Sequence, residues 1–509
     1  MPNLYTSLLA RHRNRGSVLS LAPKTQFSKV PQKLESLPLE DWRARIAEKH
    51  AAYLAEQEEV ELRSRSVGVI GAGLAGLSAA YELRKRGYAV TILEAFNIPG
   101  GRTRTVHHLV KHHGMDGGAE LIGSNHALWL WYARIFRLGF SEVLEYKNSP
   151  IMVGTTRLSP NAGKSLVGQM GDALHYISAR AKTIVDPFSA WTDPLAATLD
   201  KQNVHDFVVR TGWSRQCKEA VLQQLESDNG VVAKRQSLLA LLAMVKGGGL
   251  ERYWLDTEVC RCKRGTQALS LALESALQGM GTSIEYNTPV TQIDASGETV
   301  KLAARDGQMY KFDDVVLAIP PSAWTNISVW QPAPLASFVA SPPQMGKNVK
   351  SLLAFRRRFW KKQRFGPNST LNGPIDQTWE TTEAHSNPEF GMVAFSGADH
   401  ADKLSKMTAA AVKASVVADL QEIYAKTAAE LTNFEFMNWP REPWALASYS
   451  FPACGDVIRW GRKFSEGYQG KLHFAGEHTC YAFTGYMEGA LQSGYRLARM
   501  LIFRDGPKW

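Results

Sequence analysis

The chain has 509 residues, of which 44% are apolar and 21% are charged, so it is long enough for two or three domains with a sizeable core, and a disordered chain is excluded. Its net charge of +11 comes from 59 basic and 48 acidic residues, but the basic run at residues 11–15 lacks the interleaved aromatics of a nucleic-acid binder, so we expect a solvated surface. The five cysteines are scattered, so we expect no disulfides. We find no secretory signal and no run of ~20 apolar residues, which predicts a cytoplasmic protein without a membrane anchor.

Residues 1–65 precede any strong motif and are predicted to form an N-terminal helical extension. The tripeptide Ser36-Leu37-Pro38 is typical of a helix start, and Trp42, Ile46 and Tyr53 then recur at helical spacing. We expect an amphipathic helix from about Leu39 to Arg63 that lies on the main body, with partner binding as the alternative.

A β-α-β unit follows this extension. A short apolar strand at Val67–Ile70 leads into a helix at Leu74–Arg86, and Ala89–Glu94 forms the next strand. The unit is about 30 residues long, which is the size of a dinucleotide-binding motif.

The remainder of the chain mixes helical and strand patterns. Helices are predicted at Trp129–Phe136, Gln216–Leu225, Ser237–Val245, Thr266–Leu277, Thr408–Leu431 and Met487–Phe503. Strands are predicted within Ser283–Ile293 and at Val300–Ala304, Val315–Ala318, Lys350–Phe355 and Leu472–Phe474. This alternation favours an α/β fold.

Three glycines and an acid stand at the positions that a dinucleotide site requires. Gly71 permits the tight turn after the strand, Gly73 lets the backbone approach a pyrophosphate at the helix N-terminus, and Gly76 permits close helix–strand packing. Glu94 closes the second strand, where it can accept hydrogen bonds from the adenosine ribose. Because strand, helix and acid fall in register, the motif is more specific than a lone glycine loop.

A second glycine turn with an arginine, Gly100-Gly101-Arg102-Thr103-Arg104-Thr105, follows Glu94 and suits a cofactor longer than NAD. From Val69 to Thr105 the sequence resembles the start of the flavin amine oxidase family, which includes monoamine, polyamine and L-amino acid oxidases. The resemblance covers most of the chain from Ser66 onward. It implies FAD as the cofactor.

Further blocks resemble the family and imply contacts with FAD. Residues 116–120 are similar to the glycine segment beside the flavin, residues 288–290 to the strand that holds adenine, and residues 318–321 to a strand end near the cofactor. Residues 474–477 and 484–490 resemble the C-terminal signature, whose helix N-terminus stabilises reduced flavin. The expected cofactor-binding residues are Gly71, Ala72, Gly73, Gly76, Glu94, Ala95, Gly101, Arg102, Gly118, Ala119, Val290, Gly476, Glu477, Tyr486 and Met487.

The resemblance also implies the catalytic residues. Lys350 takes the place of a lysine near flavin N5 that holds a water molecule and assists reoxidation by oxygen. Tyr449 and Tyr486 take the places of two aromatic walls that orient the amine and exclude water. Ser448 stands where monoamine oxidases carry a cysteine attached to the flavin, so we predict noncovalent FAD, with Cys454 too far along the chain to substitute.

Glu120 is an informative departure from the family. L-Amino acid oxidases carry an arginine in this segment that pairs with the substrate carboxylate, whereas an acid here would repel a carboxylate and attract a distal ammonium. We therefore expect Glu120 to bind an amine, with a buried and internally satisfied carboxylate as the alternative. The paired histidines at 107–108 and 112–113 have no acid between them, and no metal is expected.

Together these features predict an α/β fold with a Rossmann-like FAD-binding domain of the glutathione-reductase type and an inserted α+β substrate-binding domain. We assign residues 66–125, 255–325 and 440–509 to the FAD-binding domain, and residues 126–254 and 326–439 to the substrate-binding domain. The expected function is FAD-dependent oxidation of an amine, with O2 reduced to H2O2. An L-amino acid oxidase, a flavin-bearing interaction protein and a flavin desaturase are the alternatives, and a homodimer is left open.

Overall fold

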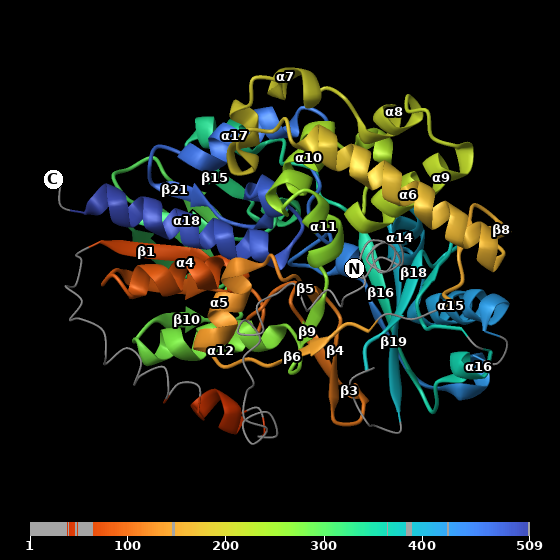
Figure 1. Cartoon of the computed structure of the whole chain (residues 1–509). Coiled ribbons are helices and arrows are strands. Elements are labelled where there is room, and N and C mark those ends of the chain that lie inside the picture. The colour runs from red at the N-terminus through yellow and green to blue at the C-terminus, as the bar shows by residue number, and fades with distance from the viewer. Residues whose placement is uncertain are drawn as a thin grey trace.

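The computed structural model describes residues 38, 40–45, 48, 65–144, 148–363, 365–382, 389–424 and 427–506. Figure 1 shows the parallel sheet and its helices in the left half of the molecule and the antiparallel sheet in the right half. A group of helices lies above both sheets. In the predicted N-terminal helix, residues 40–45 and 48 are helical, and the rest of that segment lies outside the described residues. Trp42 is buried, with the Arg264 guanidinium 5.1 Å from its ring, so this helix does lie on the main body.

The parallel sheet has five strands, in the order β10 (Ser283–Glu285), β2 (Ala89–Leu93), β1 (Ser66–Ile70), β14 (Asp314–Leu317) and β21 (Leu472–Phe474). Every neighbouring pair is parallel, and β1 and β2 are mostly apolar, with Ser66 and Thr91 as their polar residues, because both faces of the sheet are covered. The helices α4 (Leu74–Arg84), α12 (Gln267–Gly279) and α18 (Met487–Asp505) pack on one face.

The strand order places the first strand of the chain in the middle of the sheet. The chain moves outward through β2 and β10, then crosses back to β14 on the other side of β1 and continues to β21. In a sheet of this kind, a crevice opens beyond the carboxyl ends of the two strands where the direction reverses, and ligands bind there. Gly71 follows β1 and Ala318 follows β14, so these two residues mark that crevice.

A four-stranded sheet covers the other face of the parallel sheet. Its strands are β13 (Met309–Phe312), β12 (Val300–Ala304), β11 (Val290–Asp294) and β15 (Val329–Gln331), and they share a core with β14 and α17 (Asp456–Glu466). Because β15 pairs with β11, this sheet continues past residue 325, where we had expected the substrate-binding domain to begin.

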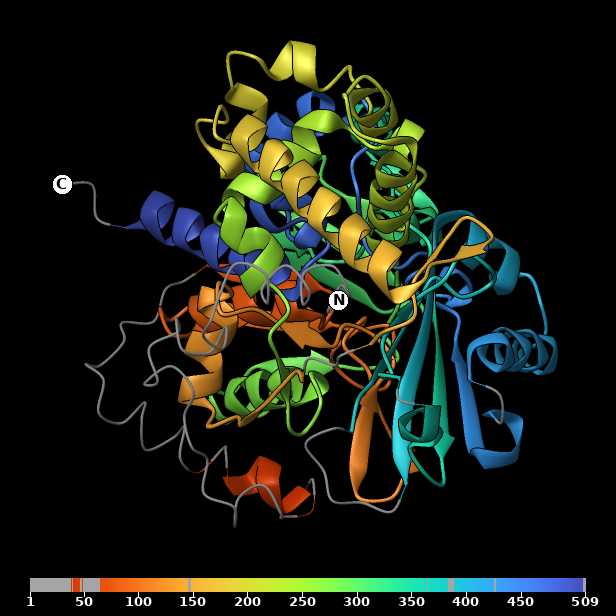
Figure 2. The same cartoon turned by 45° about the vertical axis from the view of Figure 1, so that its right-hand side comes forward.

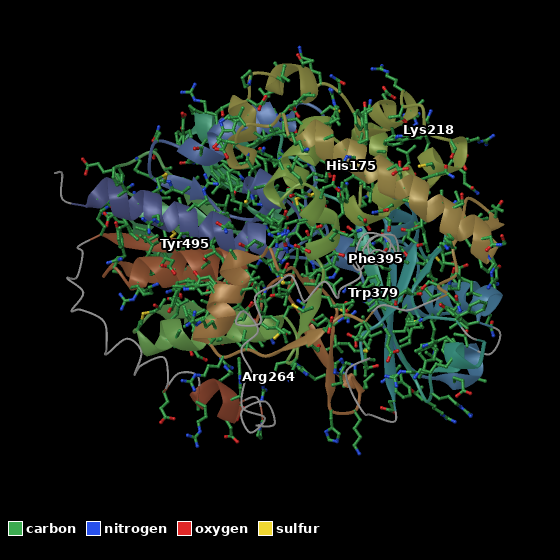
Figure 3. All side chains as sticks on the ribbon, viewed as in Figure 1. His175, Lys218, Arg264, Trp379, Phe395 and Tyr495 are labelled. Carbon is green, nitrogen blue, oxygen red and sulfur yellow. The ribbon has the colours of Figure 1, made fainter. Side chains whose placement is uncertain are left out.

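The second large sheet is antiparallel, in the order β17 (Ser369–Thr370), β18 (Gln377–Glu380), β19 (Phe390–Gly397), β16 (Asn348–Phe355) and β20 (Leu431–Met437). Its outer face packs on α15 (Ala409–Ile423). Figure 3 shows Trp379 and Phe395 on the part of this sheet nearest the centre of the molecule.

The group of helices above the two sheets includes α6 (Pro160–Ala181), α9 (Arg215–Asn229), α10 (Leu238–Gly247) and α11 (Glu251–Asp256), which share one apolar core. Figure 2 shows this group lying across the top of the molecule. The helix α6 was not predicted. The prediction of one helix over residues 408–431 was wrong at its end, because α15 stops at Ile423 and residue 431 begins β20.

Asp314 on β14 ties the ends of the parallel sheet together. Its buried carboxylate accepts hydrogen bonds from Arg65 at 2.8 Å, from Arg504 at 2.8 Å, and from His473 at 3.0 Å. Burial alone would raise the pKa of Asp314, but these donors hold it well below its usual range. This one carboxylate therefore connects the chain before β1, the strand β21 and the end of α18.

The mixed α/β architecture is thus confirmed, and its central sheet is assembled from distant parts of the chain.

Candidate functional site

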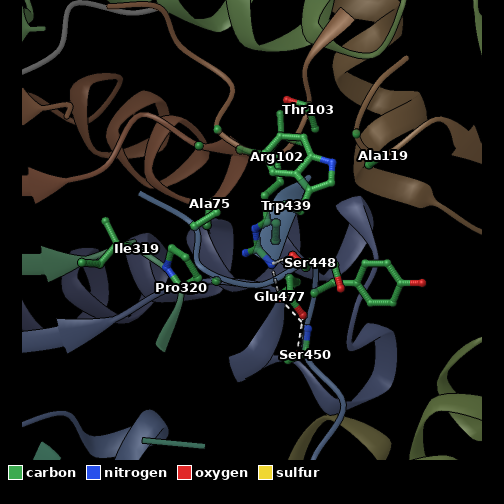
Figure 4. A pocket seen from close by; sticks show the side chains of 18 of the residues that line it. Ala75, Arg102, Thr103, Ala119, Ile319, Pro320, Trp439, Ser448, Ser450 and Glu477 are labelled. Carbon is green, nitrogen blue, oxygen red and sulfur yellow. Dashed lines mark hydrogen bonds and ion pairs between the residues drawn. The ribbon is translucent and has the colours of Figure 1, made fainter. Parts of the chain in front are cut away.

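One cavity extends from the end of β1 to the underside of the helical group. Its lining includes the glycine loop after β1, the second glycine turn at residues 100–103, residues 318–320 after β14, residues 348–350 of β16, and residues 448–450, 476–478 and 484–487. Figure 4 shows Arg102, Glu477, Ser448 and Ser450 from three of these segments pointing toward one another. All the residues predicted for the site line this cavity except Ala72 and Gly76.

The glycine loop has the shape that a bound pyrophosphate requires. Gly71 has φ +106°, a left-handed conformation that side chains resist. A Cβ on Gly76 would lie 2.1 Å from the Gly71 oxygen, so this glycine is required by the contact between helix and turn. A Cβ on Gly73 would meet nothing within 4 Å, and Gly73 lines the cavity at the N-terminus of α4, so the backbone is open to a ligand there.

Glu94 braces this loop from the end of β2. Its carboxylate accepts hydrogen bonds from the amide of Ala72 at 2.5 Å and from that of Phe96 at 2.8 Å. Burial raises the pKa of Glu94, and the two amides act against this rise. Glu94 also lines the cavity, so ribose binding and loop bracing are compatible.

Glu477 joins three of the segments that line the cavity. Its carboxylate pairs with Arg102 at 2.8 Å and accepts hydrogen bonds from the Ser450 amide at 3.1 Å and the Gly485 amide at 2.8 Å. Burial alone would raise the pKa of Glu477, but Arg102 and the other donors lower it. The second glycine turn is thereby fixed to the segments that carry both predicted tyrosines.

Lys350 lies within a buried charge network on β16. Its Nζ donates to Glu120 Oε2 at 2.9 Å and to the carbonyl of Asp116 at 3.2 Å, and it lies 5.4 Å from the centre of the Trp379 ring. Arg261 donates to the other oxygen of Glu120 at 2.6 Å. The lysine is thus held at the cavity wall by the segment 116–120 and by Trp379 on β18.

The expectation that Glu120 offers its charge to a substrate is not met. Both of its oxygens are occupied, because Trp379 Nε1 also lies 3.0 Å from Oε1 and the side chain is buried. Burial alone would raise the pKa of Glu120, but Lys350 and Arg261 lower it to about 2. Glu120 is therefore the buried and internally satisfied carboxylate that the sequence left as the alternative, and its partners are Lys350, Arg261 and Trp379.

The side chain of Asp116, whose carbonyl belongs to this network, behaves differently from Glu120. Its Oδ1 accepts hydrogen bonds from Thr105 Oγ1 at 2.7 Å and from the amide of Thr266 at 3.0 Å. Burial and the nearby charge of Glu120 raise the pKa of Asp116 to about 7. The carboxyl is therefore partly protonated near neutral pH, and the local charge is carried by Glu120.

The two predicted tyrosines reach the same cavity from different segments, and each hydroxyl is fixed. Tyr449 donates to the carbonyl of Asp228 at 2.5 Å, and the Tyr486 hydroxyl lies 3.1 Å from that of Tyr253. The Tyr253 and Tyr486 rings meet edge to face at 6.3 Å. Burial raises the pKa of Tyr449 and Tyr486 well above the usual value of 10, so both present neutral rings.

Several residues of the site had no motif that could reveal them. Arg261, Trp379, Tyr253 and Asp228 act through partners that lie far away in sequence. Arg261 alone gave a signal, since a charged residue inside the strand β9 (Cys260–Cys262) needs a buried partner.

The cavity fits FAD on two observations. The open backbone at Gly73 leaves room for a pyrophosphate beside the N-terminus of α4. His478 lines the cavity, is buried, and neither of its ring nitrogens has a hydrogen-bond partner within the described structure. A buried imidazole in this condition has hydrogen-bonding capacity that a bound ligand can satisfy. Met487 and Ala490 carry the lining to the first turn of α18.

The chain is similar to known proteins over most of its length. Residues 74–502 match the family model of flavin-containing amine oxidoreductases. The chain is 26% identical over 464 residues to amine oxidase B of Canis lupus familiaris, covering 86% of each chain. It is 27% identical over 465 residues to amine oxidase A of Sus scrofa, covering 86% of this chain and 84% of the other.

Two solved structures share the fold. Putrescine oxidase bound to putrescine superposes with a TM-score of 0.75 at 22% identity, covering 86% of this chain and 99% of that one. Cyclohexylamine oxidase from Brevibacterium oxydans IH-35A superposes with a TM-score of 0.76 at 20% identity, covering 87% and 99%. Within the described residues, no helix is long and apolar enough to cross a membrane.

Gly73→Val is expected to abolish FAD binding without unfolding the protein, because the added side chain enters the cavity and the backbone there is already extended. Gly76→Val is expected to destabilise the fold itself, because its Cβ collides with the Gly71 oxygen. Flavin absorbance after reconstitution and the melting temperature of the apoprotein measure the two effects. Gly168→Val, in open space on α6, is the control, and normal flavin uptake by Gly73→Val would contradict this account.

Glu120→Gln is expected to lower the free energy of unfolding by about 3 kcal/mol at neutral pH, because it leaves two buried cations without their counter-charge. The pKa of Glu120 is lowered from 4.5 to about 2, so its stabilisation is complete above pH 4.5 and is lost as the pH falls toward 2. Urea denaturation from pH 7 down to about pH 3 should therefore show a constant difference from wild type above pH 4.5 and a smaller difference at the acid end. Glu466→Gln, in an exposed pair with Arg462, is the control, and equal stability of Glu120→Gln and wild type at pH 7 would refute the role of this network.

Proposed function

Since the chain belongs to the family of flavin-containing amine oxidoreductases, we propose that it uses FAD to oxidise a primary or secondary amine to the imine, with O2 as the electron acceptor. Water then converts the imine to an aldehyde or ketone plus ammonia or an amine. Overall, an amine, O2 and water give the carbonyl product, the released nitrogen compound and H2O2. The observation that carries this proposal is the single cavity that joins the glycine loop to Lys350, Tyr449 and Tyr486.

The protein's contribution is to bind, orient and exclude water. FAD, when bound, supplies a two-electron acceptor for the hydride equivalent at the amine's α-carbon. Tyr449 and Tyr486, with fixed hydroxyls, would hold the amine between neutral aromatic faces and keep the α-carbon in one orientation. The helix N-terminus at Met487 would favour negative charge on a reduced cofactor.

Lys350 is the residue we assign to the oxygen step. Its ammonium is held at the cavity wall by Glu120, so a positive charge stands where O2 would acquire negative charge during reduction. Arg261 and Trp379 fix Glu120 in turn, and they act as positioning residues.

The charges of the cavity favour an amine over an amino acid. Among the described residues, the cavity lining contains one arginine, Arg102, and one lysine, Lys350. Each of them already pairs with a glutamate. Neither is placed to receive a substrate carboxylate, as an L-amino acid oxidase requires. The relatives named above are amine oxidases.

Noncovalent attachment of FAD, a cytoplasmic location and a homodimer remain predictions. The Ser448 hydroxyl donates to Asn348 at 2.6 Å, and a serine cannot form a thioether, which supports the first of these.

Anaerobic stopped-flow mixing of the FAD-loaded enzyme with a panel of amines and L-amino acids tests the proposal. We expect an amine to bleach the flavin absorbance, and subsequent O2 to restore it with release of H2O2. Lys350→Met should slow reoxidation by about a hundredfold while flavin reduction changes far less. Lys347→Met, an exposed lysine just before β16 that pairs with Asp402, is the control.

Bleaching by amino acids alone would favour the L-amino acid oxidase, and no bleaching by any compound would favour the interaction protein. Equal slowing of reduction and reoxidation in Lys350→Met would count against an oxygen role for this residue.

A further inference from the structure

The N-terminal helix at residues 40–45 takes no part in the chemistry described above. It lies before residue 74, where the match to the family model begins. Figure 1 and Figure 2 both show it as a short red helix beside α12. Because α12 packs on the parallel sheet that carries the cavity, the contacts of this helix can bear on the cavity itself.

Two consecutive residues fix the N-terminal helix to the main body. Trp42 is buried in the core that α4 and α12 share, and the Arg264 guanidinium lies 5.1 Å from the centre of its ring. Arg43 forms an ion pair with Glu274, a buried residue of α12. One residue therefore supplies apolar burial and the next supplies the counter-charge of a buried carboxylate, so the helix has a defined position.

Glu274 connects this ion pair to the segment that follows β10. Its Oε1 accepts a hydrogen bond from the Tyr286 hydroxyl at 2.6 Å, while Arg43 donates to Oε2. One oxygen of the carboxylate is thus used by the helix and the other by the tyrosine. Burial raises the pKa of Tyr286, and the hydrogen bond to Glu274 raises it further, so the hydroxyl remains a neutral donor.

Tyr286 belongs to a segment that forms one end of the cavity. Thr288 donates from Oγ1 to the Tyr286 carbonyl at 2.9 Å and from its amide to the Glu94 carbonyl at 2.8 Å. The amide of Asn287 donates to the carbonyl of Phe96 at 2.9 Å. Because Thr288, Glu94 and Phe96 all line the cavity, the position of Tyr286 is tied to the position of the cavity wall.

The first turn of α12 contacts the second glycine turn. Gln267 donates from Nε2 to the carbonyl of Pro99 at 3.0 Å and accepts the amide of Thr105 at 3.1 Å. The Ser270 hydroxyl lies 3.1 Å from that of Thr103, which lines the cavity. The helix α12 therefore holds two parts of the cavity wall, and the N-terminal helix is fixed against it.

We propose that Trp42 and Arg43 are positioning residues for the cofactor. Arg43 holds Glu274, and Glu274 holds Tyr286. The segment fixed in this way forms the Glu94 end of the cavity, which takes the adenosine part of FAD. Trp42 supplies the buried contact that keeps the helix in place. The inference rests on the proposed use of FAD, and it makes the N-terminal helix part of the cofactor site.

Preorganisation explains how a helix outside the cavity acts on affinity. A wall that already has its bound position needs less ordering when the ligand binds, so the ligand binds more tightly. The coupling is reciprocal, because a contact that favours FAD binding must itself be favoured by bound FAD. FAD should therefore hold the N-terminal helix more firmly against α12.

Equilibrium binding of FAD to the apoprotein tests the proposal. Arg43→Gln is expected to raise the Kd of FAD about tenfold, because Glu274 loses its charged partner and Tyr286 its fixed acceptor. Tyr286→Phe keeps the ring and the ion pair, and it is expected to raise the Kd by a similar factor. Because both changes act through Glu274, the double variant should bind FAD about as weakly as either single variant, whereas two unrelated losses of stability would add.

The same helix offers a matched control. Arg45 pairs with Glu48 at 3.6 Å on the exposed side of the helix, so Arg45→Gln removes the same charge and should leave the Kd of FAD unchanged. Arg43→Lys keeps the charge and should restore part of the affinity. The melting temperature of each apoprotein shows whether it is folded, and if Arg43→Gln does not fold, Tyr286→Phe decides the outcome.

Hydrogen exchange of the backbone amides of residues 42–45, with and without FAD, gives a second readout that does not depend on activity. We expect FAD to slow this exchange in the wild type. In Tyr286→Phe the helix keeps its own contacts but loses its connection to the cavity, so FAD should slow the exchange far less.

The two levels of inference fail differently. A Kd for FAD within about twofold of wild type in both Arg43→Gln and Tyr286→Phe, or equal weakening by Arg45→Gln, overturns the positioning role and leaves amine oxidation standing. An apoprotein that binds no FAD removes both inferences. A wild type that binds FAD and oxidises no amine removes the proposed function alone.

Discussion

The ion pair between Arg102 and Glu477 is the interaction on which the architecture of the site depends. Arg102 follows the second glycine turn, and Glu477 follows the last strand of the parallel sheet, 375 residues later. The same carboxylate accepts hydrogen bonds from the backbone amides of Ser450 and Gly485, and each of these residues is next to a tyrosine of the cavity. A single charged group therefore aligns the part of the cavity that suits a dinucleotide with the part that suits an amine.

Buried charges of this kind cost energy to desolvate, and they persist where each has a partner. Glu477 is matched by Arg102, and Glu120 by Lys350 and Arg261. Both glutamates keep lowered pKa values despite burial, so both networks stay charged at neutral pH. Each pair therefore fixes part of the cavity wall while both partners keep their charge.

The sequence predicted best where chemistry and local structure coincide. The strand, glycine turn, helix and acid from Val67 to Glu94 were placed almost to the residue, because each glycine has its own steric reason. The strand order of the parallel sheet was not predictable in the same way, since β1 pairs with β14 across 247 residues (Val67 with Asp314) and β14 pairs with β21 across 157 (Val315 with Leu472). Residues 431–437 alternate apolar and polar positions around Phe434 and Phe436, a strand signal that the Ala-rich run before them concealed.

The sequence identified which residues form the site better than it identified what each residue does. Glu120 was assigned to the substrate because its partner Arg261 lies 141 residues away, and a pattern along the chain cannot reveal such a pair. Asp228 was missed for the same reason, since only the folded chain brings the end of α9 beside Tyr449. Charge balance within a cavity is a property of the tertiary structure.

The dissociation constant of FAD in Glu477→Gln tests most directly whether this carboxylate organises the site. The account predicts that FAD binds about tenfold to a hundredfold more weakly to the variant, because the glutamine loses the charge that holds Arg102 and weakens the bonds to both amides. A folded Glu477→Gln apoprotein that binds FAD as tightly as the wild type would contradict it.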